Sequence, residues 1–382
     1  MANRAGSSGI DATLFRQEGP WCTAFVDASL GTTAAQEAAD ALPDTVSQLL
    51  KSQQASAADI EAMRSALRPA EGRPAPVSRF IAVNGGKVVL DELVQGVKTA
   101  APQVDCSEFP NLVPLARAHG GQFPYLVAEV GRDGGEVSLR HSAVAGVAEE
   151  YRIAGDREEA HHARRVPGRY EESKNQHQTS EIWRRNADEI ARLVDEVARD
   201  TRARLVVLAG DTKARELVLS QLAEPTRALT VTLGQHTRTG GADATAVEKD
   251  IEAHVAALLA DDIRELSERI SNQVNAAQPG AVLGFDEVVW ALQQGQASTV
   301  VVAEFQDDHS LLALGGEPWL ASEDSDVEGA GALGSWPAPE VLLRAVAMTD
   351  ASIRYVPAGV LPDGAGIAAL LRWPKGGAAG AA

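Results

Sequence analysis

The sequence predicts an α/β protein that is divided into three domains. Short apolar runs of strand length alternate with longer stretches in which apolar residues recur at helical spacing. The chain has 382 residues, whereas an ordinary domain contains roughly 100 to 160. The run VDCSEFPNLVPL closes the first group of elements, and the linker Ala277-Gln278-Pro279-Gly280 precedes the last. We therefore expect domains with independent cores at residues 1–115, 116–276 and 277–382.

The first domain is expected to be a mixed α/β domain with two helices. Residues 20–28 predict a strand, and residues 33–53 and 57–68 predict helices. The apolar runs VSRFIAV and KVVLDEL follow, separated only by Asn84-Gly85-Gly86. Because asparagine and glycine tolerate positive φ, these two runs predict a tight hairpin.

The middle domain is predicted to contain parallel strands. Its first two strands, FPYLVAEV and GEVSLRHS, form a hairpin around Arg132-Asp133-Gly134-Gly135. The strand of residues 205–210, a helix over residues 211–222 and the strand ALTVTL make a strand-helix-strand unit with short connections. Such a unit requires a parallel pair of strands. A long helix is predicted over residues 246–274.

The third domain is predicted to be a compact α/β/α structure. FDEVVWALQQGQASTVVVAEF predicts a helix, a Gly-containing turn and a strand, and a helix at residues 339–348 and strands at residues 352–356 and 366–372 complete the domain. Residues 322–339 are rich in acid, Gly and Pro and predict a mobile loop. Four basic and thirteen acidic residues lie within residues 277–382. This balance favours a basic protein partner over RNA.

The composition narrows the classes of function. Two cysteines, Cys22 and Cys106, lack Cys-x-x-Cys spacing, which predicts reduced thiols in a cytoplasmic protein and no structural zinc. The N-terminus lacks the apolar core of a signal peptide, and apolar runs such as residues 205–209 are only strand-sized, so no membrane contact is expected. The stretch around Gly240-Gly241 has no Walker or dinucleotide pattern, so no cofactor is expected.

A basic segment in the middle domain is the main candidate for a binding site. Residues 161–185 contain six Lys or Arg and three acidic residues within a chain of formal charge -18. A positive segment on a negative protein favours an anionic partner such as an RNA backbone. A solvated face, with Arg184 paired to Asp188, is the alternative. The residues expected to bind RNA are Arg164, Arg165, Arg169, Lys174, Gln176, His177, Gln178, Arg184 and Arg185.

This basic segment is expected to be a loop that precedes an amphipathic helix. Thr179 or Ser180 can cap the helix. Packing of the helix against a sheet would hold the polar loop on a rigid element. Spacings of four and three residues place one apolar stripe on the helix: Trp183, Ala187, Ile190, Val194 and Val197.

Two catalytic interpretations of the segment are weaker. His161 and His162 follow Glu158 and Glu159, but this spacing matches no common tetrahedral or facial site, so a solvated loop is preferred and no metal is expected. His177 has neither a nucleophile nor an orienting acid in its local sequence. This favours RNA contact or plain solvent over a role as a general base.

The order of these parts resembles the archaeo-eukaryotic peptide release factor family, which includes Pelota, and more closely its bacterial branch with the Balon-like hibernation factors. The resemblance spans most of the chain. Its strongest matches are EGPWCTAFVDAS, FPNLVPL, residues 168–199 and FDEVVWALQQGQASTVVVAEF. The resemblance implies a ribonuclease-H-like middle domain and a third domain similar to proteins that bind RNA kink-turns.

Release factors of this family carry Gly-Gly-Gln on a loop before a long middle-domain helix, where it helps to position water against the ester of peptidyl-tRNA. The corresponding place here reads Asn175-Gln176-His177-Gln178, without glycines. Because a Cβ restricts positive φ, efficient peptide release is not expected. A literal Gly120-Gly121-Gln122 stands before a predicted strand instead of a long helix, so no catalytic role is expected for it.

The resemblance implies a cytoplasmic factor that occupies the ribosomal A site and stabilises idle or stressed ribosomes. Its implied partners are ribosomal RNA, tRNA and elongation factor Tu. The alternative is a peptidyl-tRNA hydrolase of ribosome quality control, in which Gln176 or Gln178 positions water. A metal-dependent nuclease, suggested by the implied fold of the middle domain, is the weakest interpretation because the sequence contains no compact acidic cluster.

Overall fold

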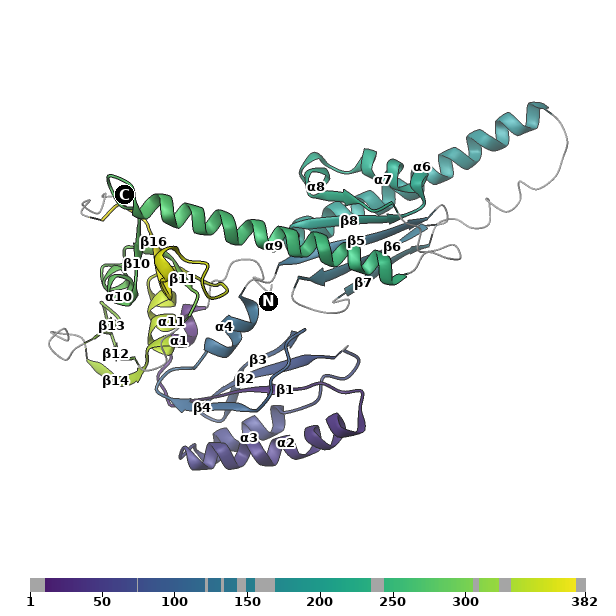
Figure 1. Ribbon diagram of the computed structural model, residues 1–382. Helices are drawn as coiled ribbons and strands as arrows, with labels where there is room; N and C mark the ends of the chain where they lie inside the picture. The colour runs from purple at the N-terminus through teal and green to yellow at the C-terminus, as the bar shows by residue number, and fades with distance from the viewer. Residues whose placement is uncertain are drawn as a thin grey trace. The chain divides into compact units, whose positions relative to one another are not determined.

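The chain forms two compact units (Figure 1). Unit 1 consists of Met1–Gly121 and Ala260–Ala382, and unit 2 consists of Gln122–Leu259, so unit 2 is inserted into the sequence of unit 1. The computed structural model describes residues 11–73, 75–120, 123–131, 134–142, 149–154, 169–234, 244–304, 309–322 and 331–375.

The N-terminal segment of unit 1 forms an antiparallel sheet with the order β3-β2-β1-β4. The predicted hairpin is confirmed, because Gly85 and Gly86 connect β2 to β3 with φ angles of 55° and 73°. Glycine adopts these angles without a steric penalty. The strands are β1 (Trp21–Asp27), β2 (Val77–Asn84), β3 (Lys87–Gln95) and β4 (Gln103–Ser107).

Two helices cover one face of this sheet (Figure 1). The side chains of Thr32 and Ser56 cap them by accepting hydrogen bonds from N–H groups of the first turn. Leu50 and Met63 of the helices are fully buried and pack with Ile81 of β2. The helices of this segment are α1 (Ala12–Phe15), α2 (Thr33–Ser52), α3 (Ala57–Ala66) and α4 (Val113–His119).

The C-terminal segment of unit 1 forms two sheets, β10-β16-β11-β15 and β13-β12-β14, in which only β11 and β15 pair in parallel. The prediction of a loop at residues 322–339 is wrong for its last part, because Ala332–Pro337 form β14 and pair with β12. The elements are β10 (Ala281–Leu283), α10 (Phe285–Gln293), β11 (Ala297–Val302), β12 (Ser310–Leu314), β13 (Leu320–Ala321), β14, α11 (Ala338–Met348), β15 (Ser352–Tyr355), the 3-10 turn η2 (Pro362–Gly364) and β16 (Ile367–Leu371).

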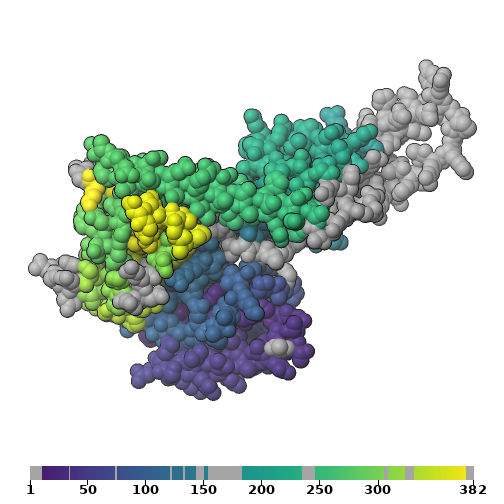
Figure 2. All heavy atoms as spheres, viewed as in Figure 1, coloured from purple at the N-terminus to yellow at the C-terminus, as the bar shows by residue number. Residues whose placement is uncertain are grey.

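The two segments of unit 1 share one hydrophobic core and lie against each other (Figure 2). Phe109 is 1% exposed, and its ring centroid lies 6.4 Å from that of Phe15 and 5.9 Å from that of Trp336 in β14. Helices α2 and α3 cover only one face of the first sheet, so its other apolar face is buried in this common cluster. The expectation that residues 277–382 have an independent core is therefore wrong.

Unit 2 is a five-stranded sheet, β7-β6-β5-β8-β9, with helices on both faces (Figure 1). The predicted strand-helix-strand unit is confirmed, because β5, β8 and β9 are parallel. Helices α6 and α7 pack on one face, and the first half of α9 packs on the other. The elements are β5 (Pro124–Gly131), β6 (Gly134–His141), β7 (Glu149–Ala154), α6 (Arg169–Thr201), β8 (Leu205–Gly210), α7 (Thr212–Gln221), α8 (Glu224–Ala228), β9 (Thr230–Thr232) and α9 (Ala244–Val274).

The predicted α/β class is confirmed by these sheets and their covering helices. Helix α9 contributes to both units, since Val247 and Ile251 pack in unit 2 and Ile270 packs in unit 1. Within the described ranges, no helix combines the length and apolar character needed to cross a membrane.

Candidate functional site

The basic segment is only partly covered by the described residues. Arg164 and Arg165 lie outside them, as do His161 and His162. The expected loop at residues 169–178 is wrong, because helix α6 begins at Arg169 and runs to Thr201. The stretch after Pro167-Gly168 contains no further Gly or Pro and is rich in Glu, Arg, Lys and Gln, which favour helix. Lys174, Gln176, His177 and Gln178 are therefore positions on a helix.

The C-terminal part of α6 is fixed to unit 2 by the predicted apolar stripe. Ile190 and Val194 are at most 1% exposed, and Ala187 and Val197 are also buried against the sheet. Trp183 is half-buried and borders a small hollow with Ala187, Ile190 and residues of α7. Every side chain that lines this hollow is apolar or absent, so it offers no group for acid-base or nucleophilic chemistry.

Arg184 and Arg185 are exposed on α6. The alternative pairing of Arg184 with Asp188 is not formed, because the Asp188 carboxylate accepts from Arg192 at 2.7 Å. In the part of the chain that the structure describes, no ion pair or hydrogen bond engages either guanidinium. These two cations are thus available to an anion in solution.

At the carboxyl ends of the parallel strands β8 and β9 in unit 2, polar side chains are engaged in intramolecular hydrogen bonds. Asp211, directly after β8, caps α7 by accepting from the N–H groups of Lys213 and Ala214 at 3.0 and 3.1 Å. Arg215 is 8% exposed, and its guanidinium donates to the carbonyl of Leu233 beyond β9. Among the described residues, no group of three or more His, Cys, Asp or Glu side chains is arranged to hold a metal ion.

The literal Gly120-Gly121-Gln122 precedes a strand, as predicted, and follows the short helix α4, which was not predicted. Gly120 ends α4, and its N–H donates to the carbonyls of Ala116 and Arg117 at 2.9 and 3.1 Å. A Cβ at Gly120 would lie 3.0 Å from the Cβ of Tyr355, so close packing accounts for this glycine. Gly121 and Gln122 lie outside the described residues.

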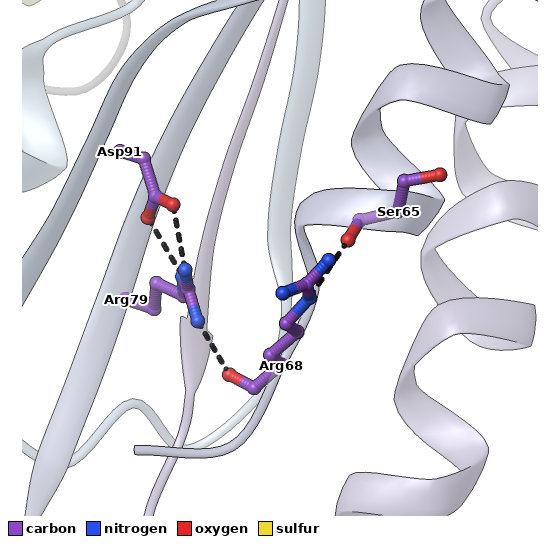
Figure 3. Close-up of polar contacts among 4 residues, drawn as sticks. All are labelled: Ser65, Arg68, Arg79 and Asp91. Atoms are coloured by element: carbon purple, nitrogen blue, oxygen red, sulfur yellow. Dashed lines mark hydrogen bonds and ion pairs between the residues drawn. The ribbon is translucent and has the colours of Figure 1, made fainter. Parts of the chain in front are cut away.

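A groove between α3 and β3 in unit 1 was not predicted from the sequence. Arg79 forms two hydrogen bonds of 2.7 and 2.6 Å with the carboxylate of Asp91 and donates a third to the carbonyl of Arg68 at 2.8 Å (Figure 3). Arg68 in turn donates from Nε to the carbonyl of Ser65 at 3.2 Å. The Arg79–Asp91 pair is neutral as a unit, so it mainly ties the hairpin to the end of α3.

A second unpredicted polar cluster lies where the two segments of unit 1 meet. Asn111 donates from Nδ2 to Oε1 of Glu340 at 3.1 Å, whereas Oε2 of Glu340 is buried without a partner among the described residues. Burial, followed by the negative charge of Asp105, raises the pKa of Glu340 to about 7. The buried Arg344, one turn further along α11, lies over the rings of Phe109 and Trp319. Burial lowers the pKa of Arg344.

Comparison with known proteins shows a family resemblance in the middle of the chain. The model of bacterial archaeo-eukaryotic release factor family 2 matches residues 124–275, which cover nearly all of unit 2 and the rest of α9. The resemblance to release factors that the sequence predicts is thereby confirmed. The more specific likeness to Balon-like hibernation factors stays a prediction.

Curated relatives and solved structures resemble the chain over most of its length. The uncharacterised protein Rv2629 of Mycobacterium tuberculosis is 25% identical over 318 residues, which are 82% of this chain and 82% of the relative. Pelota of Archaeoglobus fulgidus is 16% identical with a TM-score of 0.32, covering 80% of this chain and 82% of that chain. Dom34 of S. cerevisiae, a translation termination-like factor, is 10% identical with a TM-score of 0.41, covering 79% and 82%. At these scores, the two structures carry no conclusion about function.

Proposed function

We propose that this protein is a ribosome-binding, release-factor-like translation factor that stabilises idle or stressed ribosomes and does not release peptide efficiently. The observation that carries the proposal is the match of residues 124–275 to a release factor family. The exposed cations of α6 support it, because they lie within the matched region of a chain with formal charge -18. Exposed cations that are confined to one part of an acidic protein favour contact of that part with a phosphate backbone.

The local structure of α6 supports the proposed lack of efficient peptide release. Residues 175–178 stand where release factors carry Gly-Gly-Gln, and they lie beyond the first turn of a helix that begins at Arg169. Backbone N–H groups beyond the first four of a helix donate within the helix, so they are not free to stabilise an oxyanion. Side chains at Gln176 or Gln178 would have to act without that backbone support.

Ribosome binding is tested by co-sedimentation with ribosomes over a salt series. Arg184→Ala together with Arg185→Ala should weaken binding and reduce the salt slope by about one for each phosphate contact that is lost. The matched control removes two arginines further along the same helix, Arg192→Ala and Arg199→Ala, and should bind as the wild type does. A variant without Arg164, Arg165, Arg169 and Lys174 extends the test to the rest of the segment. Equal affinity and slope in all proteins would reject the RNA-binding role.

Peptide release is tested with ribosomes that carry peptidyl-tRNA. Little peptide should be released by the wild-type protein, and Gln176→Ala and Gln178→Ala should change neither release nor binding substantially. Rapid release that disappears in either variant would instead establish the peptidyl-tRNA hydrolase. Gln122→Ala is the control for the second Gly-Gly-Gln sequence, since a loss of release in that variant would assign catalysis to residues 120–122.

Elongation factor Tu is the proposed protein partner of the acidic C-terminal segment. Residues 277–382 contain thirteen acidic and four basic residues, and both Asp286 and Glu317 are exposed. Asp286→Asn with Glu317→Gln should reduce affinity for ribosomes loaded with the elongation factor and leave affinity for bare ribosomes unchanged. Equal losses on both kinds of ribosome, or no loss on either, would remove this partner from the proposal.

A further inference from the structure

The only two cysteines of the 382-residue chain face each other on neighbouring strands. Cys22 in the central strand β1 is directly opposite Cys106 in β4, although 84 positions separate them in the sequence. Directly opposite residues of an antiparallel pair project from the same face of a sheet. Their Sγ atoms lie 2.6 Å apart, so the two thiols are in direct contact.

The backbone already has a geometry that a disulfide can span. Opposite residues of antiparallel strands have Cα atoms roughly 4.5 or 5.5 Å apart, and disulfides join Cα atoms at about 4.4 to 6.8 Å. No strand has to separate or slide to bring the sulfurs of Cys22 and Cys106 together. Because the chain has no third cysteine, an intramolecular disulfide can have only this connectivity.

The two thiols differ in their access to solvent. Cys22 is 1% exposed, within the cluster that includes Leu50 and Met63 beneath α2 and α3. Cys106 is only half-buried, and its strand β4 is the edge of the sheet. The hydrogen bond with Cys106, then burial, raises the pKa of the Cys22 thiol, which disfavours its thiolate. Because Cys106 is the more exposed of the two, a small oxidant should react first at its sulfur.

We propose that Cys22 and Cys106 are a redox-responsive pair, which peroxide converts into a disulfide between β1 and β4 and which low-molecular-weight thiols restore. The Cys106 thiolate attacks one oxygen of hydrogen peroxide, forming a sulfenic acid and releasing hydroxide. The Cys22 sulfur then attacks the sulfenic sulfur and water leaves. In total, two thiols and one peroxide give one disulfide and two waters. Two thiols of the reductant reverse the reaction by exchange and become a disulfide themselves.

The surroundings of the pair should make its oxidation slow and its disulfide stabilising. Asp59 and Asp105 lie near Cys22, and their negative charges oppose thiolate formation, so the pair should react more slowly than a catalytic thiol. The link would close a loop that contains α2, α3, β2 and β3, which are most of the N-terminal sheet and its helices. Closing a long loop restricts the unfolded chain most, so oxidation should stabilise this segment. The inference does not depend on ribosome binding.

The experiment treats the folded full-length protein with hydrogen peroxide and follows it by intact-mass spectrometry without reductant. The wild type should lose about 2 Da, and both cysteines should become inaccessible to N-ethylmaleimide in denaturant. Dithiothreitol should restore both reactive thiols. The melting temperature of the oxidised protein should rise by roughly 5 °C or more and return on reduction.

Single variants separate a reactive pair from inert buried thiols. In Cys22→Ala, the remaining Cys106 should gain about 16 or 32 Da on oxidation, while in Cys106→Ala the buried Cys22 should stay unmodified. If either variant fails to fold, the intact mass and the maleimide accessibility of the oxidised wild-type protein decide the proposal. Two maleimide-reactive thiols after peroxide treatment, disulfide formation only after unfolding, or a linkage between two molecules would each overturn it.

Discussion

The stability of unit 1 should fall as the pH rises through neutrality, because Glu340 must lose a proton while buried. One carboxylate oxygen of Glu340 accepts from Asn111 at 3.1 Å, and the other has no partner in the described part of the chain. Burial, with a smaller contribution from the charge of Asp105, raises the pKa from its ordinary value of 4.5 to about 7. Burial also raises the pKa of Asp105 itself, although Ser107 opposes this.

The direction and the size of this change in stability with pH follow from proton linkage. Between pH 4.5 and about 7 the folded protein keeps a proton on Glu340 that the unfolded chain has lost, so the stabilisation present below pH 4.5 is lost as the pH rises through about 7. At about 1.36 kcal/mol per unit of pKa, the upper limit is roughly 3.4 kcal/mol. Since Glu340 is only partly buried, solvent screening reduces the expected loss to about 1 to 2 kcal/mol.

Urea denaturation, followed by tryptophan fluorescence at pH 5.5 and pH 8.5, measures this loss. Glu340→Gln keeps the hydrogen bond from Asn111 but cannot titrate, so its unfolding free energy should change less between the two pH values than that of the wild type. Glu61→Gln, at an exposed position of α3, is the matched control and should retain the wild-type profile. Identical pH profiles for the wild type and Glu340→Gln would refute the assignment.

Three further predictions concern the cores and one close approach of the backbone. Phe109→Ala should lower the unfolding free energy by about 3 to 5 kcal/mol and Phe109→Leu by much less, as measured in urea. Deleting residues 277–382 should expose the shared core and leave a fragment whose N-terminal segment is protease-sensitive, so a protease-resistant sheet would contradict the shared core. Gly210→Ala should lower the melting temperature strongly, because the added Cβ would lie 2.1 Å from the carbonyl oxygen of Val130 and residue 210 has a φ of 111°. Gly234→Ala is the control and should change the melting temperature little, because a Cβ at residue 234 would meet open space.

The elements that the sequence predicts correctly are those with local signals. The hairpin at residues 84–86 follows from two glycines, and the stripe on α6 follows from spacings of four and three. The shared core of unit 1 has no local signal. Phe109 and Trp336 pack together although unit 2 separates their segments in the sequence. Nothing in the sequence around either residue indicates this contact.

The candidate site likewise has features that local sequence signals predict and features that require the tertiary structure. The basic composition of residues 161–185 can be read from the sequence, but the cap signal at Thr179 or Ser180 placed the start of α6 about ten residues too late. A capping side chain contributes only about 1 kcal/mol, and a longer run of helix-forming residues outweighs it. Asn111 and Glu340 are 229 positions apart, so their contact and the raised pKa of Glu340 require the tertiary structure.

The insertion of unit 2 separates the proposed binding residues in sequence from the groups that set the stability of unit 1. The family match and the exposed arginines of α6 fall within residues 124–275, and this region has two hydrophobic clusters of its own. The cysteine pair and Glu340 belong to unit 1, whose two segments are held by one common core. Substitution of Arg184 and Arg185 should therefore change affinity for RNA without changing the melting of unit 1. Oxidation of Cys22 and Cys106 should do the reverse, so the two sets of variants can be combined and their effects should add.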